Sequence, residues 1–67
     1  MNYERVLLMI KDRAIATKSL INETEGRIND DRYISISTFL YRALKNLKEE
    51  FDELNAAHSI IEKENVF

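Results

Sequence analysis

The feature that most constrains this chain is a set of apolar residues at seven-residue spacing in a long stretch without glycine or proline. Four of them share that spacing and two more flank the series: Leu40, Leu47, Leu54 and Ile61, with Leu44 and Phe51. Residues seven apart lie on one face of a helix. The spacing therefore predicts a helix over about 38–65 with one continuous apolar stripe. It is also compatible with a parallel zipper between chains.

The N-terminal part of the chain shows the same period. Four residues form its main seven-residue series: Leu7, Ala14, Ile21 and Ile28. This pattern predicts a first helix over about 3–28, whose end lies between 25 and 29 because Gly26 either terminates it or is tolerated within it. A cluster of turn-forming residues, 29–32, follows. The alternation in 33–37 leaves open whether that segment is a short strand or part of the loop.

Together these elements predict an all-α fold, an antiparallel two-helix hairpin with coiled-coil-like packing and a connection over 29–37, in one domain of 67 residues. Folding back between Asp30 and Asp31 would place Leu7 opposite Leu54 and bring the two apolar seams together. It would also place Lys11 and Arg13 beside the acidic run 49–53, so charge and hydrophobic pattern favour the same direction.

A hairpin of this length has little core, and the sequence contains no cysteine for a disulfide. Several apolar residues fall off the predicted seam: Val6, Leu8, Met9, Ile15, Leu20, Phe39, Tyr41 and Ile60. Leaving so much apolar surface in water is unfavourable. These residues predict a self-association or partner surface, with a homodimer that forms a four-helix bundle as the simplest use and a different protein as the alternative.

No group of residues has the spacing of a catalytic or metal site. His58 and Glu62 share a helix face, but two ligands do not make a metal site, and His58 is expected to face Tyr3 at the open end of the hairpin. The acidic run 49–53 is expected to form a solvated face because consecutive helical residues point in different directions. We therefore expect no enzymatic activity, no cofactor and no metal.

The net charge of −2 disfavours nucleic acid as a partner. Arg42, Lys45 and Lys48 nevertheless form a basic strip on the second helix that could contact phosphates. The segment 32–37 followed by a helix also resembles, in outline, the opening of ribbon-helix-helix repressors. That resemblance implies a strand that enters the DNA major groove, with Arg32, Ser35 and Ser37 as the residues to test.

The leading hypothesis is a non-enzymatic protein-protein interaction module: a small regulator, adaptor or inhibitor that occupies a partner's surface. By analogy, many such short proteins are encoded by phages and mobile elements. The alternative is a small DNA-binding transcriptional regulator that uses 32–37 or the basic strip. No membrane partner is expected, because the longest apolar run spans five residues, 6–10, against the roughly 20 of a membrane helix. The expected location is the cytoplasm.

Overall fold

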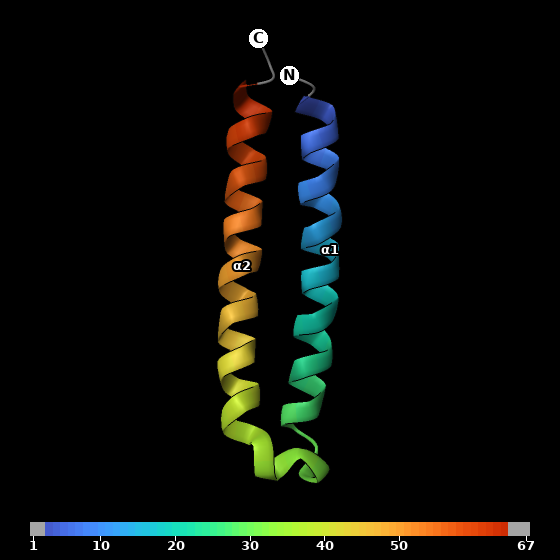
Figure 1. Cartoon of the computed structure of the whole chain (residues 1–67), viewed down its shortest axis with the longest axis vertical. Helices are drawn as coiled ribbons and strands as arrows, with labels where there is room; N and C mark the ends of the chain where they lie inside the picture. The colour runs from blue at the N-terminus through green and yellow to red at the C-terminus, as the bar shows by residue number, and fades with distance from the viewer. Residues whose placement is uncertain (1–2, 65–67) are drawn as a thin grey trace.

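The computed structural model describes residues 3–64 as two long antiparallel helices that lie side by side (Figure 1). Helix α1 spans Tyr3–Ile28, a short 3-10 helix, η1, spans Asp31–Ile36, and α2 spans Ser37–Glu64. The two long helices pack against each other along their length. This confirms the predicted all-helical, two-helix fold. The predicted end of the second helix at 65 lies outside the described residues.

The segment after α1 is helical, so the extended alternative for 33–37 is wrong. The Asp30 carboxylate accepts a hydrogen bond from the Arg32 backbone N–H at 3.0 Å, and the Tyr33 N–H donates to the Asp30 carbonyl at 3.0 Å. An aspartate that satisfies free N–H groups in this way starts a helical turn. The alternation of apolar and polar residues in 33–37 was too short to distinguish this turn from a strand.

Helix α1 continues through Gly26 and ends two residues later. No neighbouring atom lies within 4 Å of the position where a Cβ at Gly26 would stand, so this glycine is not required by packing. Beyond it, the Asn29 side-chain amide donates to the Glu25 carbonyl at 3.1 Å, and the Asp30 N–H donates to the Arg27 carbonyl at 3.1 Å. These bonds satisfy carbonyls that the helix end would otherwise leave free.

Contacts between the helices show how the hairpin is aligned. Arg13 donates to Glu50 at 2.7 Å, which confirms that it lies beside the acidic run. A turn between Asp30 and Asp31 would have placed Lys48 opposite Arg13, two residues earlier in α2. Lys18 reaches Phe51, with the amine 5.8 Å from the ring centroid, whereas the same turn would have placed Ala43 opposite Lys18, eight residues earlier in α2. The displacement follows from the connection, because η1 adds residues after Asp31 before α2 begins.

Full burial is confined to the half of the hairpin near the connection. The buried residues among those described are Thr17, Ile21, Thr24 and Leu40. Both threonine hydroxyls donate to carbonyls one turn back, from Thr17 to Arg13 at 2.8 Å and from Thr24 to Leu20 at 2.7 Å. A threonine in a helix can satisfy its hydroxyl in this way, so these two bury without an unpaired polar group.

The hairpin is long and thin. Its Cα atoms extend over 51 × 14 × 14 Å with a radius of gyration of 15.4 Å, whereas a compact chain of this length has a radius of gyration of about 11 Å. Nearly every side chain therefore lies close to solvent. The small buried set must supply much of the stability of the isolated chain.

Two isoleucines of α1 test this distribution of stability. Ile21 is 2% exposed and Ile15 is 61% exposed. We expect Ile21→Ala to lower the free energy of unfolding by about 2–5 kcal/mol, enough to unfold much of a marginal hairpin, because it leaves a cavity in the core. Ile15→Ala should change it by less than about 0.5 kcal/mol. Urea unfolding followed by circular dichroism measures both. Equal losses would contradict the assignment of the core.

Candidate functional site

The most prominent surface feature is the number of large apolar side chains exposed to solvent. In residues 3–64 they are Leu8, Met9, Ile15, Leu20, Ile34, Ile36, Phe39, Tyr41 and Ile60. All the predicted surface residues are among them except Val6, which is half-buried. Ile34 and Ile36 were not among the predicted surface residues, because their alternation with polar residues was assigned to the connection. Monomeric proteins seldom expose large contiguous apolar patches without an interaction to cover them.

The Arg13–Glu50 ion pair identifies one side of the hairpin. Val6 and Leu20 lie seven residues on either side of Arg13, so they share its stripe on α1. Ala43 and Ala57 stand in the same relation to Glu50 on α2. Four of the predicted surface residues fall on this side by their helical positions, and we call them the ion-pair face: Val6, Met9, Leu20 and Phe39. Ile60 lies on the outer side of α2, eleven residues beyond Glu49 and therefore on the same stripe.

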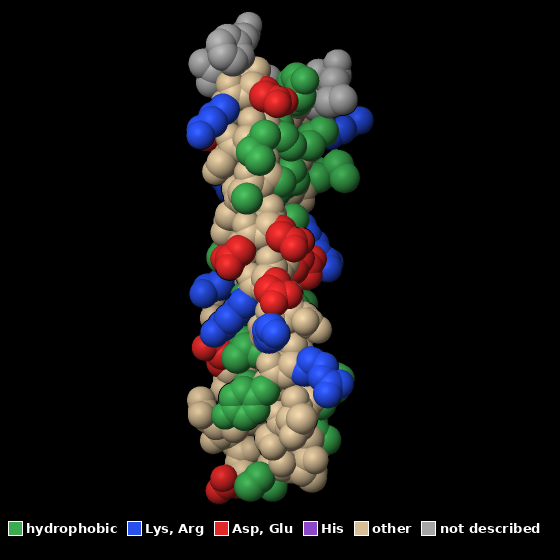
Figure 2. All heavy atoms as spheres, turned by 90° about the vertical axis from the view of Figure 1, so that its left-hand side faces the viewer, with side chains coloured by type: hydrophobic (Ala, Val, Ile, Leu, Met, Phe, Trp, Pro, Cys, Tyr) green, Lys and Arg blue, Asp and Glu red, His purple; other side chains and the backbone are tan. Residues whose placement is uncertain are grey.

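Apolar side chains of the ion-pair face form two groups along the hairpin. Val6 and Met9 lie toward the open end, and Leu20 and Phe39 lie toward the connection. The ion pair lies between them. Figure 2 shows the neighbouring outer surface of α2, where charged side chains gather in the middle and apolar side chains lie mainly toward the two ends, with further charges among them. From the open end, the order on this stripe of α1 is therefore apolar, Arg13, apolar, followed at the connection end by Arg27, which pairs with Glu23.

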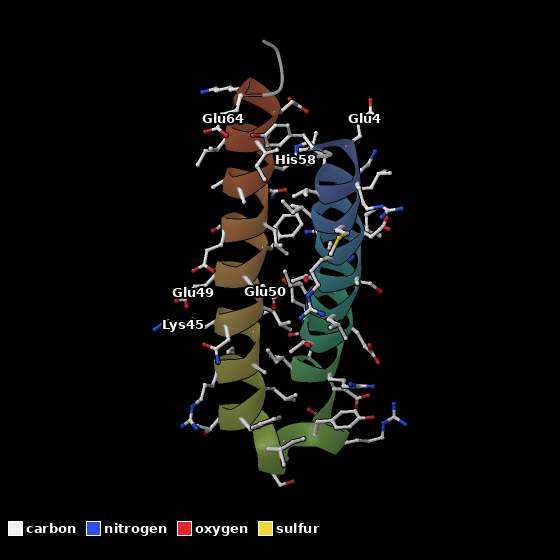
Figure 3. All side chains as sticks on the ribbon, turned by 45° about the horizontal axis from the view of Figure 1, so that its top comes forward. Glu4, Lys45, Glu49, Glu50, His58 and Glu64 are labelled. Carbon is white, nitrogen blue, oxygen red and sulfur yellow. The ribbon has the colours of Figure 1, made fainter. Side chains whose placement is uncertain are left out.

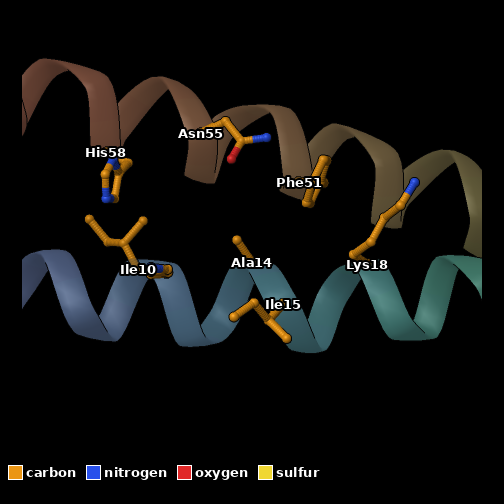
Figure 4. Close-up of a pocket in the computed structure, with 8 residues that line it drawn as sticks. Ile10, Ala14, Ile15, Lys18, Phe51, Asn55 and His58 are labelled. Atoms are coloured by element: carbon orange, nitrogen blue, oxygen red, sulfur yellow. The ribbon is translucent and has the colours of Figure 1, made fainter.

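The remaining predicted surface residues, Leu8, Ile15 and Tyr41, lie on the opposite side of the seam. Here the hairpin has a cavity of about 440 Å³ between the two helices (Figure 4). Eight residues line it: Ile10, Lys11, Ala14, Ile15, Lys18, Phe51, Asn55 and His58. A second hollow continues it toward the open end and is lined by Glu4, Leu7, Leu8, Lys11 and His58. We call the two together the groove.

The groove combines an apolar floor with a charged edge, on which Lys11 and Lys18 outnumber Glu4. Figure 4 shows His58 across from Ile10. Phe51 lies nearer the connection on α2, and Lys18 extends from α1 toward α2. Lys11 and Lys18 are exposed and lie seven residues apart on the same edge of α1. None of the residues that line the groove is fully buried, so its floor is accessible along its length.

His58 lines both parts of the groove. Its Nδ1 is 3.6 Å from a carboxylate oxygen of Glu62, the pair predicted from their spacing. In residues 3–64, no three histidine, cysteine or acidic side chains come together as a metal site requires. Figure 3 shows His58 pointing toward α1. Its neighbours in the groove are mainly apolar, with Lys11 at the edge.

Among the predicted phosphate contacts, Arg32 is engaged within the connection. Its guanidinium donates from Nη2 to Asp30 Oδ2 at 2.7 Å and from Nε to both carboxylate oxygens at 3.1 and 3.2 Å. These hydrogen bonds raise the pKa of Arg32 and, with the backbone bond from Arg32, lower the pKa of Asp30. Arg32 also lies over Tyr33, as does Arg27, each 5.9 Å from the ring centroid.

The basic strip is exposed, but acidic residues follow it directly in the sequence, starting at Glu49. Arg42, Lys45 and Lys48 are all exposed on α2. In Figure 3, Lys45 and Glu49 both point away from α1, one turn apart, whereas Glu50 points toward it. The segment 31–36 is a 3-10 helix, so the strand that the ribbon-helix-helix resemblance requires is not formed. The strand that this resemblance implied for 32–37 is therefore wrong.

No protein-family model, curated protein or solved structure matches this chain. Neither of the two described long helices combines enough length with enough hydrophobicity to cross a bilayer. The evidence for a function therefore comes from the exposed apolar residues of the ion-pair face and the groove.

The Asp30–Arg32 contact predicts how stability depends on acidity. Since the pKa of Asp30 is lowered from 3.8 by Arg32, the carboxylate stabilises the fold above pH 4, and this contribution is lost as pH falls through the lowered value. Asp30→Asn keeps a capping oxygen but removes the charge. We expect its melting temperature to be below that of the native chain at pH 7 and the difference to narrow below pH 4. A difference independent of pH would contradict this assignment.

Proposed function

We propose that this chain is a non-enzymatic protein-protein interaction module, a small regulator, adaptor or inhibitor, whose hairpins pair into a dimeric four-helix bundle that occupies the surface of a partner protein. The observation that carries the proposal is the exposure of large apolar side chains on both sides of a hairpin that has a very small core. Such surface is unfavourable in water and is relieved by association.

The accessible surface area supports association. The chain exposes 5412 Å², whereas a compact monomer of 7.9 kDa exposes about 4,400 Å². The excess is about 1,000 Å². A stable protein interface buries about 800 Å² from each partner. The extra surface of the hairpin is thus comparable to what one interface would cover.

The arrangement of the ion-pair face favours a second copy of the chain as the occupant of that face. Two hairpins laid side by side with both connections at the same end bring each apolar group against the same group of the other copy. The central layer then alternates Arg13 and Glu50 around the bundle. Each α1 also lies beside the α2 of the other copy and runs antiparallel to it, which is favourable for the helix dipoles.

The opposite orientation, with the connections at different ends, fits less well. If α1 of one hairpin packed on α1 of the other hairpin, the two Arg13 side chains would meet near the symmetry axis. If α1 instead packed on α2 of the other copy, these neighbouring helices would run parallel. We therefore propose a dimer with its two-fold axis along the hairpins, a symmetric interface of the kind most common in soluble homodimers.

Substitutions on the two sides of the hairpin test the dimer. Met9→Glu with Phe39→Glu adds two charges to the ion-pair face at positions 66% and 63% exposed. Leu8→Glu with Tyr41→Glu adds the same charge to the groove side at positions that are both 60% exposed. We expect light scattering to give a dimer mass for the native chain and the groove-side variant and a monomer mass for the ion-pair variant. Circular dichroism checks that all three stay helical.

Two results would contradict the proposed dimer. A native chain that remains monomeric across a range of concentrations would leave the ion-pair face unpaired. Equal weakening of association by both double variants would show that association is not specific to the ion-pair face. Equal exposure of the substituted positions makes a general effect of added charge visible, since it would alter both variants alike.

The orientation is tested separately with a spin label on the connection. The sequence contains no cysteine, so Ser35→Cys, at an exposed position of η1, provides one labelling site per chain. With both connections at one end we expect a label separation below about 30 Å by pulsed electron resonance, because neighbouring helices pack 8–10 Å apart. Connections at opposite ends would give a separation near the 51 Å length of the hairpin and would overturn the orientation.

A further inference from the structure

We propose that the groove between Lys11, Ile15, Phe51 and His58 binds an acidic amphipathic helix of the partner protein. This deepens the proposed function, since it names the surface used for the partner and the chemistry of the segment that fits there. The ion-pair face and the groove lie on opposite sides of the seam, so a dimer formed through the first leaves the second open. A helix in a groove between two helices is a common mode of protein recognition.

The floor of the groove requires an apolar occupant. Ile10, Ala14 and Phe51 contribute apolar surface from both helices, and Ile15 stands exposed beside them (Figure 4). Toward the open end, Leu7 and Leu8 continue this surface. The groove lies mainly in the half of the hairpin without a fully buried residue. A third helix packed there would supply the burial that the two helices do not reach alone.

The charged residues that line the groove are Lys11 and Lys18, which are basic, and Glu4 at the open end, which is acidic, so the edge favours a negatively charged helix beside the two lysines. Lys11 and Lys18 border the groove, although the whole chain has a net charge of −2. Their α-carbons lie seven residues apart, about 10 Å along the helix axis. A partner helix with two carboxylates seven residues apart beside an apolar stripe would place one against each lysine. Such rim pairs contribute to specificity and orientation more than to total affinity.

Another copy of this chain does not meet that requirement. Within α1 and within α2, no two acidic residues are seven positions apart. The self-complementary order of apolar and charged groups also belongs to the ion-pair face and not to the groove. The groove therefore fits a segment of a different protein better than it fits a second hairpin.

The shape of the groove favours a helix over a small ligand. Pockets for small molecules enclose most of the surface of their ligand, but here Ile15 remains 61% exposed and no lining residue is fully buried. On α1 the groove runs from Glu4 to Lys18, a length of about 21 Å at 1.5 Å per residue. That length matches about four turns of a docked helix.

Two synthetic helical peptides test the groove. The first carries leucines along one face and two glutamates seven residues apart beside them, and the second has lysines in place of the glutamates. We expect the glutamate peptide to bind the native chain saturably in fluorescence anisotropy. Lys11→Glu with Lys18→Glu should raise its Kd at least about tenfold. The same variant should bind the lysine peptide more tightly than the native chain does.

Arg42→Glu with Lys45→Glu is the matched control, because it makes the same change of charge on the outer side of α2. It should leave the Kd of the glutamate peptide within about twofold of the native value, since both residues are exposed, Lys45 points away from α1 (Figure 3), and salt screens exposed charges that do not touch the peptide. An equal loss in both variants, or no saturable binding to the native chain, would overturn the proposal. The proposal would also be overturned if dodecanoate bound the native chain, lost affinity in the Lys11→Glu with Lys18→Glu variant, and the glutamate peptide did not bind. That result would assign the groove to small amphiphiles.

The mass of each variant separates this test from that of the dimer. Lys11→Glu with Lys18→Glu should remain a dimer by light scattering, because neither residue lies on the ion-pair face. Peptide binding by a chain that proves monomeric would support the groove and contradict the dimer. A dimer that binds no peptide would contradict the groove alone.

Discussion

The structure depends on the apolar seam between α1 and α2, which is fully closed to solvent only near the connection. Ile21 and Leu40 are the apolar residues buried there, with Thr17 and Thr24 beside them. Both threonines satisfy their hydroxyls within their own helix, so the polar groups add no unpaired donor to the core. Because two helices enclose so little volume, burial cannot extend to the side chains on either side of the seam.

The exposed surfaces follow from that geometry. A side chain that lies beside the seam and not in it is not covered by side chains of the other helix. Residues of this kind fall on two sides, the ion-pair face and the groove. They differ in character: the ion-pair face has an apolar, charged, apolar order that suits a symmetric contact, whereas the groove has an apolar floor with Lys11 and Lys18 along one edge. Two proposed contacts thus arise from one short seam.

Much of the hairpin could be read from periodicity, because a helix buries residues at intervals that the sequence displays directly. The series at 40, 47, 54 and 61 indicated the second helix, and Arg13 with the acidic run indicated the antiparallel direction. The connection was harder to predict. Its 3-10 turn depends on Asp30 bonding the Arg32 backbone and side chain, and several residue types permit either a turn or an extended segment there.

By itself, the sequence determined the two helices and most of the apolar residues that remain exposed, because these depend on spacing along one helix. It also indicated the antiparallel direction, through the match of charge and apolar pattern between the two helices. Only the tertiary structure decided which of those residues stand together. The eight predicted surface residues looked like a single surface, but the Arg13–Glu50 contact places Val6 and Leu20 on one side, while Leu8 and Ile15 fall on the other. The groove likewise requires Lys18 to lie beside Phe51. That proximity is set by the length of the connection and the resulting register between the helices, and periodicity within either helix carries no information about it.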